Sequence, residues 1–139
     1  MPSAELLLDT HVWVPLALGA KKFDAKAARR LERAADEGSL LLSAISVWEV
    51  AMLSDAGRLR LPPTAAEWAR TAVQAARVSL VPVDFDVAVD AGRQSAMHGD
   101  PADRIIFATA AVRGATLVTA DQKLLAHAKK VKLPTLAPW

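Results

Sequence analysis

Short apolar runs alternate along this chain with longer segments that have helical character. The runs cover residues 6–8, 40–42, 80–83 and 116–119, and each is too short to form a helix. Runs of this length, bounded by turn signals, are typical of strands that are buried on both faces. Strands that alternate with helices predict an α/β fold with a mainly parallel sheet. A possible edge strand at 131–133 would bring the number of strands from four to five.

The segments between the runs carry helix start and stop signals. Ser46 and Glu49 match a capping box, as do Thr64 and Glu67, while Asp100 suits an N-cap. We expect helices over 12–18, 24–37, 46–56, 64–77, 86–97, 101–113 and 121–128.

Four acidic residues lie close to the ends of predicted strands or at the start of a helix. Asp9 follows the first apolar run, Glu49 comes shortly after the second, and Asp121 follows the fourth. Asp103 stands with Asp100 at a predicted helix start. Each has an ordinary explanation, because Asp9 and Asp121 can cap helices and Glu49 can close its capping box. Asp100 and Asp103 can stabilise a helix N-terminus against the helix dipole.

Taken together, these acids favour a functional interpretation. The carboxyl ends of parallel strands meet at one edge of a sheet, where α/β proteins bind their ligands. Carboxylates gathered there repel one another unless a cation lies between them. The chain has no cysteine, and its histidines do not have the spacing of a ligand pair. Oxygen ligands alone favour Mg²⁺, with Mn²⁺ possible, over zinc.

Composition narrows the class of protein. A chain of 139 residues with 53% hydrophobic residues is large enough for a core, and we expect residues 1–139 to form a single domain. The N-terminus lacks the basic region of a signal peptide, and no apolar run approaches the ~18 residues of a membrane helix. We therefore expect a soluble, cytoplasmic protein without a membrane partner. The formal charge of +2 is only a slight preference for polyanions.

Four motifs in this order resemble the PIN domain, and more narrowly the VapC toxins of bacterial toxin–antitoxin pairs. They are Leu-Leu-Leu-Asp9-Thr10-His11-Val-Trp, Ser46-Val-Trp-Glu49-Val-Ala, Asp100-Pro-Ala-Asp103-Arg104-Ile-Ile, and Leu-Val-Thr119-Ala-Asp121. The resemblance spans nearly the whole chain. It implies a three-layer α/β/α fold with a central sheet of four or five strands, and an endoribonuclease that cleaves RNA with metal-activated water.

The resemblance also assigns roles to single residues. It makes Asp9, Glu49, Asp103 and Asp121 the catalytic residues and metal ligands. The residues expected to line or orient this site are Thr10, Asp100, Arg104 and Thr119. For Arg104 an ion pair that orients the acids is favoured over a direct phosphate contact.

Apolar side chains near the acids suggest a protein partner. Trp13 and Trp48 follow the first two strands, and the helix with Met52 and Leu53 is apolar around most of its circumference. Such a helix is either fully buried or covered by another chain. The resemblance implies a VapB-like antitoxin as that chain, and a homodimer. We therefore expect Trp13, Trp48, Met52 and Leu53 to bind a partner.

Other α/β proteins also place aspartates at strand ends. A phosphatase-like domain needs a second aspartate two residues after the first, where His11 stands. A receiver-like domain is compatible with Asp84 after the third run, but leaves Glu49 and Asp103 without a role. A non-catalytic module that binds metal and RNA or assembles into a complex remains open, and divalent-metal-dependent turnover of RNA separates it from an enzyme.

Overall fold

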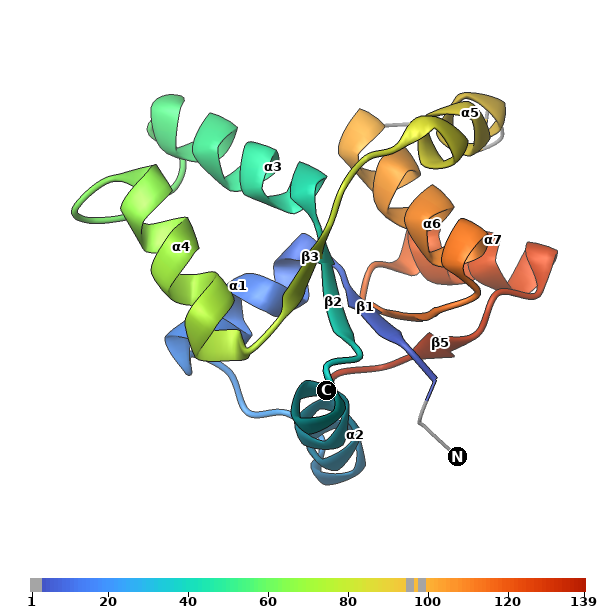
Figure 1. Cartoon of the computed structure of the whole chain (residues 1–139), viewed down its shortest axis with the longest axis horizontal. Helices are drawn as coiled ribbons and strands as arrows, with labels where there is room; N and C mark the ends of the chain where they lie inside the picture. Colours follow the sequence, from blue (N-terminus) through green and yellow to red (C-terminus); the bar gives the residue numbers. More distant parts are fainter. Residues whose placement is uncertain (1–3, 95–96, 98–99) are drawn as a thin grey trace.

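A five-stranded parallel sheet forms the centre of the molecule (Figure 1). The computed structural model describes residues 4–94, Met97 and residues 100–139. Strands lie in the order β3-β2-β1-β4-β5, and all four pairings are parallel. The strands are β1 (Leu6–Leu8), β2 (Leu40–Ser43), β3 (Ser79–Val81), β4 (Thr116–Val118) and β5 (Thr135–Leu136).

Seven helices in the described ranges cover the two faces of the sheet (Figure 1). They are α1 (Thr10–Leu18), α2 (Ala25–Glu37), α3 (Ala44–Asp55), α4 (Ala65–Ala76), α5 (Phe85–Arg93), α6 (Pro101–Arg113) and α7 (Gln122–Val131). None of these helices is long and apolar enough to span a lipid bilayer.

Alternation along the leucine strands explains the three layers. Successive side chains of a strand point to opposite faces. Leu6 and Leu8 accordingly belong to a core with residues of α1, α2 and α4, whereas Leu7 belongs to a second core with residues of α6 and α7. A run that is apolar at every position therefore fits a sheet covered on both faces, and the predicted α/β/α architecture is confirmed.

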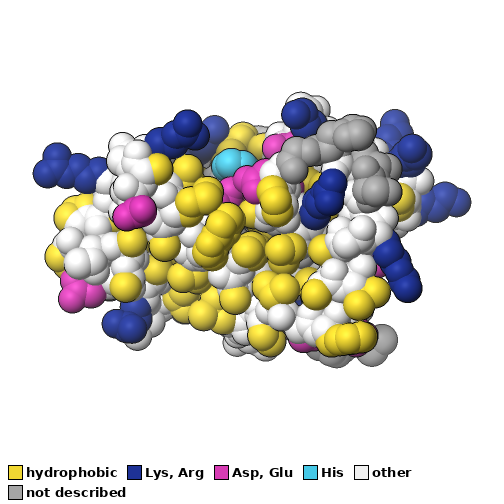
Figure 2. Space-filling view, turned by 90° about the horizontal axis from the view of Figure 1, so that it is seen from above, with side chains coloured by type: hydrophobic (Ala, Val, Ile, Leu, Met, Phe, Trp, Pro, Cys, Tyr) yellow, Lys and Arg dark blue, Asp and Glu magenta, His cyan; other side chains and the backbone are white. Residues whose placement is uncertain are grey.

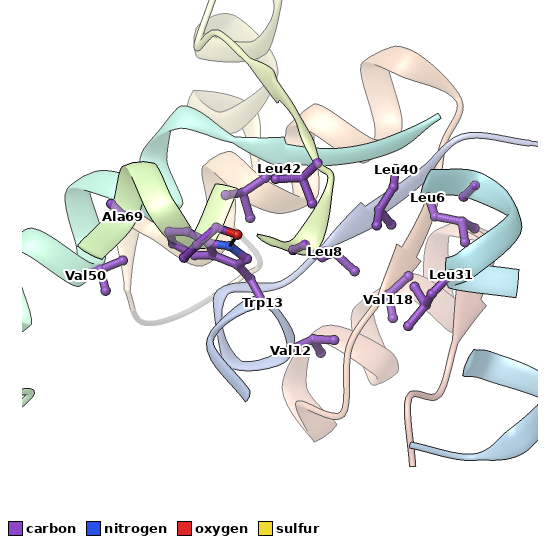
Figure 3. Close-up of a cluster of buried hydrophobic side chains, with 14 of the residues drawn as sticks. Leu6, Leu8, Val12, Trp13, Leu31, Leu40, Leu42, Val50, Ala69 and Val118 are labelled. Atoms are coloured by element: carbon purple, nitrogen blue, oxygen red, sulfur yellow. Dashed lines mark hydrogen bonds between the residues drawn. The ribbon is translucent and has the colours of Figure 1, made fainter. Parts of the chain in front are cut away.

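Trp13 lies at the centre of the first core (Figure 3) and has no exposed surface. Its ring centroid is 5.4 Å from that of Trp68, and its Nε1–H donates to the carbonyl of Ala72 at 3.5 Å. The prediction that Trp13 binds a partner is therefore wrong. The helix that follows β1 turns this side chain inward, onto α4, instead of outward to solvent.

Several element boundaries differ from those predicted. Helix α3 begins at Ala44, because Ser43 caps it by accepting a hydrogen bond from the Ile45 N–H at 3.2 Å. The predicted capping box of Ser46 and Glu49 is therefore wrong. The edge strand predicted at 131–133 is also wrong, because α7 continues to Val131 and the last strand is β5.

The sequence predicts β3 and α5 to begin one residue later than they do in the structure. Strand β3 covers residues 79–81 instead of 80–83, and α5 begins at Phe85 because the Asp84 side chain caps it. Helix α5 ends at Arg93, four residues before the predicted end at Met97. Of the residues between, 95 and 96 lie outside the described part.

Candidate functional site

Asp9 lies at the carboxyl end of β1 and is 1% exposed. It stands at the N-cap position of α1, but its side chain makes no capping hydrogen bond. Instead, Oδ2 accepts a hydrogen bond of 2.6 Å from the hydroxyl of Thr119, which follows β4. The other oxygen, Oδ1, is buried and has no hydrogen-bond partner among the described residues. The capping explanation for Asp9 therefore fails, and a buried acceptor is left available.

Glu49 points into the same region from the first half of α3 and is 6% exposed. Burial raises the pKa of its carboxyl, and the charges of Asp100 and Asp9 raise it further. A hydrogen bond from the Thr10 hydroxyl and the nearby imidazole of His11 act in the opposite direction on this pKa. Thr10 and His11 therefore offset only part of the rise in the pKa of Glu49. The contribution of Asp9 to that rise is expected if both acids belong to one site.

Asp103 lies in the first turn of α6, and the charges of all the other candidate acids affect the pKa of its carboxyl. Burial is the largest cause that raises its pKa, followed in decreasing order by the charges of Asp9, Asp100, Asp121 and Glu49, and together they bring this pKa to about 6. An acid responds to neighbours in this way only when they are close. The structure therefore brings the four predicted acids, together with Asp100, to one edge of the sheet.

Asp121 and Asp100 also serve as helix caps. Asp121 Oδ1 accepts from the N–H groups of Lys123 and Leu124 at 2.8 and 3.0 Å, which begins α7. Asp100 Oδ1 accepts from the Ala102 N–H at 2.9 Å, which begins α6. Capping uses one oxygen of each carboxylate. The structural and functional explanations therefore coexist at these two positions.

Two buried hydroxyl groups connect the acids to the fold. Thr119 Oγ1 donates to Asp9 and accepts from the Asp121 N–H at 3.0 Å. Thr10 Oγ1 forms a hydrogen bond of 2.8 Å with the hydroxyl of Ser46, which is fully buried. Ser46 was missed as a site residue because its spacing to Glu49 reads as a capping box. Its buried hydroxyl in fact supports Thr10.

Arg104 does not have its predicted partner. Its Nε–H donates to the Met97 carbonyl at 3.1 Å, and within the described ranges it forms no ion pair with Asp103. The expected orienting ion pair is therefore wrong. Arg104 instead links α6, which Asp100 caps, to the backbone of Met97. His98, which the sequence predicts to pack or to form hydrogen bonds near the acids rather than to bind metal, lies outside the described residues.

The acid cluster offers the carboxylate oxygens that a divalent cation such as Mg²⁺ prefers as ligands. Asp9 Oδ1 is a buried acceptor without a hydrogen-bond partner among the described residues, and the charges of the other acids raise the pKa of both Glu49 and Asp103. In the part of the chain that the structure describes, however, no three acidic or histidine side chains are close enough to enclose an ion.

An apolar band borders the acidic edge. Figure 2 shows the acids and a histidine next to a continuous hydrophobic surface. Trp48 and Met52 are 48% and 40% exposed, as expected for residues that a partner covers. Leu53 is half-buried and packs partly inside the molecule. The exposed large hydrophobic residues on β3, α5 and the segment between them are Leu80, Val83, Phe85 and Val89.

Comparison with known proteins places this fold and site in a family. The sequence profile described as the PIN domain matches residues 6–130. Ribonuclease VapC22 of Mycobacterium tuberculosis is 35% identical over 123 residues, which are 88% of this chain and 91% of that protein.

Solved structures agree on the fold. A VapBC2 structure from Rickettsia felis, bound to a DNA fragment from its promoter, superposes with a TM-score of 0.68 and 16% identity, over 96% of this chain and 98% of that one. The FitAcB structure from Neisseria gonorrhoeae superposes with a TM-score of 0.64 and 22% identity, over the same shares.

Proposed function

This chain belongs to the PIN domain family, and on that premise we propose that it is a divalent-metal-dependent endoribonuclease, the toxin of a VapBC-like toxin–antitoxin pair. The observation that carries the proposal is the convergence of five carboxylates on one sheet edge, where burial and the charges of the four other acids raise the pKa of Asp103 to about 6. The identity to a protein named ribonuclease supports RNA as the substrate. Membership of the family replaces the receiver-like and phosphatase-like interpretations.

Asp9, Glu49, Asp103 and Asp121 are the residues that would hold Mg²⁺ or Mn²⁺. Such an ion acidifies a bound water and neutralises charge that develops on the phosphodiester. The chain supplies the positions of the ligands. Thr119 holds one oxygen of Asp9 and leaves Oδ1 unpaired. Thr10, which forms a hydrogen bond with Ser46, also acts on Glu49 and lowers the pKa of its carboxyl.

Cleavage of RNA should require a divalent cation. Protein purified free of partner chains is expected to cut single-stranded or looped RNA in Mg²⁺ or Mn²⁺, to stop in EDTA, and to recover when excess Mg²⁺ is restored. The measurement is the loss of a labelled RNA on a denaturing gel, with the RNA in buffer and Mg²⁺ alone as the control. Cleavage that continues unchanged in chelator would refute the metal mechanism. Absence of cleavage with any cellular RNA, although RNA is bound, would favour a non-catalytic module.

We also propose that a VapB-like antitoxin inhibits the site. The acids form a region of negative charge, and Figure 2 shows hydrophobic surface next to acidic side chains. Trp48 and Met52 form an exposed apolar face on α3, the helix that also carries Glu49. An antitoxin segment that covers this apolar face and places a basic side chain among the carboxylates would remove their repulsion in the cation's place. The relatives crystallised as VapBC and FitAB complexes support such a partner.

Two copies of the chain are proposed to associate through the outer side of β3 and the beginning of α5. β3 is the edge strand of the sheet, and Phe85, 81% exposed, projects beside Leu80 and Val83. A two-fold interface pairs a surface with itself, so an apolar surface needs no complementary charge.

Phe85→Glu should weaken self-association at least about tenfold, ~1.4 kcal/mol. Sedimentation velocity measures this, with Val131→Glu on the distant α7 as a matched control that stays dimeric. A wild-type monomer at micromolar concentration would contradict this interface.

A further inference from the structure

Trp48 differs from the other tryptophans of the chain in the contacts that its ring makes. Trp13 and Trp68 pack against each other, and Trp139 packs edge-on against Phe23 at 5.5 Å with the ammonium of Lys21 4.0 Å from its ring centroid. Within the described ranges, the Trp48 indole has no ring contact, cation contact or hydrogen bond, and it is 48% exposed. Exposure of such a large apolar side chain calls for an explanation outside the folded chain.

The position of Trp48 ties it to the acidic edge. It immediately precedes Glu49 on α3, and consecutive helix residues project roughly 100° apart. Glu49 turns inward among the carboxylates while Trp48 stays on the outer flank of the same turn. A nucleotide whose phosphate lies at the carboxylates therefore has its base within reach of the indole. Figure 2 shows hydrophobic surface next to acidic side chains on this side of the molecule.

The residues around Trp48 are suited to binding the flat ring of one nucleobase. Its exposed neighbours on α3 are Ala51 and Met52, which carry no charge. The apolar hollow that could seat a bulkier segment lies on the other flank of α3, between Val47, Val73 and Leu80, and Trp48 does not line it. An exposed aromatic face beside a backbone-binding site is the arrangement by which proteins hold unpaired bases.

We propose that Trp48 is the stacking platform for an unpaired nucleobase next to the cleaved phosphodiester. This inference rests on the proposed nuclease function. It makes single-stranded or looped RNA the substrate class, because a paired base is already stacked within its duplex. Stacking on an aromatic side chain is worth about 1–3 kcal/mol per base. That contribution acts on the bound substrate and therefore appears mainly in KM.

Kinetics on a single-stranded RNA with a mapped cut site tests the proposal. Trp48→Ala and Trp48→Leu should each raise KM about tenfold with kcat within about twofold, which is the loss of roughly 1.4 kcal/mol of stacking. Trp48→Phe, which keeps an aromatic face, should recover most of the loss. Val112→Ala, an exposed apolar residue on α6, is the matched control. Leucine separates stacking from general apolar contact, because a protein partner would accept it.

Removing the base from the RNA completes a double-mutant cycle. An abasic nucleotide beside the cut should raise the wild-type KM about tenfold, yet cost Trp48→Ala almost nothing more. Additive losses, or an unchanged KM in Trp48→Leu, would overturn the proposal. If only antitoxin binding is lost, Trp48 serves the antitoxin alone and the stacking role is refuted. Should the wild type not cleave at all, the nuclease function fails, and fluorescence anisotropy of the same RNA on Trp48→Ala still tests the stacking separately.

Discussion

Replacing Asp9 with asparagine is expected to lower kcat for RNA cleavage about a thousandfold, ~4 kcal/mol in the barrier. The asparagine has nearly the same shape and can still accept the hydrogen bond of Thr119. It lacks the charge needed to hold a divalent cation. Because Asp9 also raises the pKa of Asp103, that pKa should fall below about 6 in the variant. Initial rates in saturating Mg²⁺ measure the first effect, and NMR titration of the metal-free protein measures the second.

The same substitution should stabilise the metal-free fold slightly, by about 1 kcal/mol, because one of several mutually repelling charges is removed. Asp24→Asn is the matched control. Asp24 caps α2 by accepting from the Ala27 N–H at 3.1 Å, and asparagine caps a helix equally well. Cleavage and stability should both remain as in the wild type. Wild-type turnover by Asp9→Asn would remove Asp9 from the site and with it the proposed arrangement of ligands.

The strands were the most predictable part of the chain. Leu6–Leu8 and Leu40–Leu42 are apolar at every position, which fits a central strand covered on both faces, and the structure has both strands in these places. The start of α6 was equally clear, because an N-cap aspartate followed by proline permits few other structures. β5 could not be read from the sequence, because its two residues have no alternation from which to judge.

The acids were predictable as a set because the topology of parallel strands brings their carboxyl ends together. What each side chain does there was less predictable. Ser43 and Ser46 are both good N-cap residues, and only packing of α3 decides that Ser43 caps while Ser46 is buried against Thr10. Arg104 is next to Asp103 in sequence, yet the helix directs its guanidinium to the Met97 carbonyl.

Whether an apolar residue is exposed was also not predictable from the sequence. Trp13 and Trp48 have similar sequence settings, one after each of the first two strands. Their exposures are opposite, because α1 packs on α4 over the sheet whereas the outer flank of α3 has no cover in the described chain. Periodicity identifies the apolar positions of a helix, but whether another element covers them depends on contacts that are distant in sequence.

Expression of the chain without its antitoxin should arrest bacterial growth, and co-expression of the product of the adjacent gene should relieve the arrest. Asp9→Asn, which keeps the fold, should be harmless on its own, so toxicity depends on cleavage and not on the presence of the protein. Growth curves after induction measure this. Absence of arrest by a protein with full nuclease activity in vitro would contradict the role as a toxin.

Inhibition should have two separable components. In the proposed mode of inhibition a basic group of the antitoxin takes the place of the cation. Raising Mg²⁺ should then weaken inhibition of purified protein, measured as a shift in the half-inhibitory antitoxin concentration. The apolar component should depend on the exposed face of α3. Met52→Lys places a charge on that face and should reduce rescue of growth at least tenfold more than it reduces cleavage. If Mg²⁺ leaves inhibition unchanged and Met52→Lys is rescued like the wild type, the antitoxin acts at another surface, because neither the charge nor the apolar face of this edge is then part of its contact.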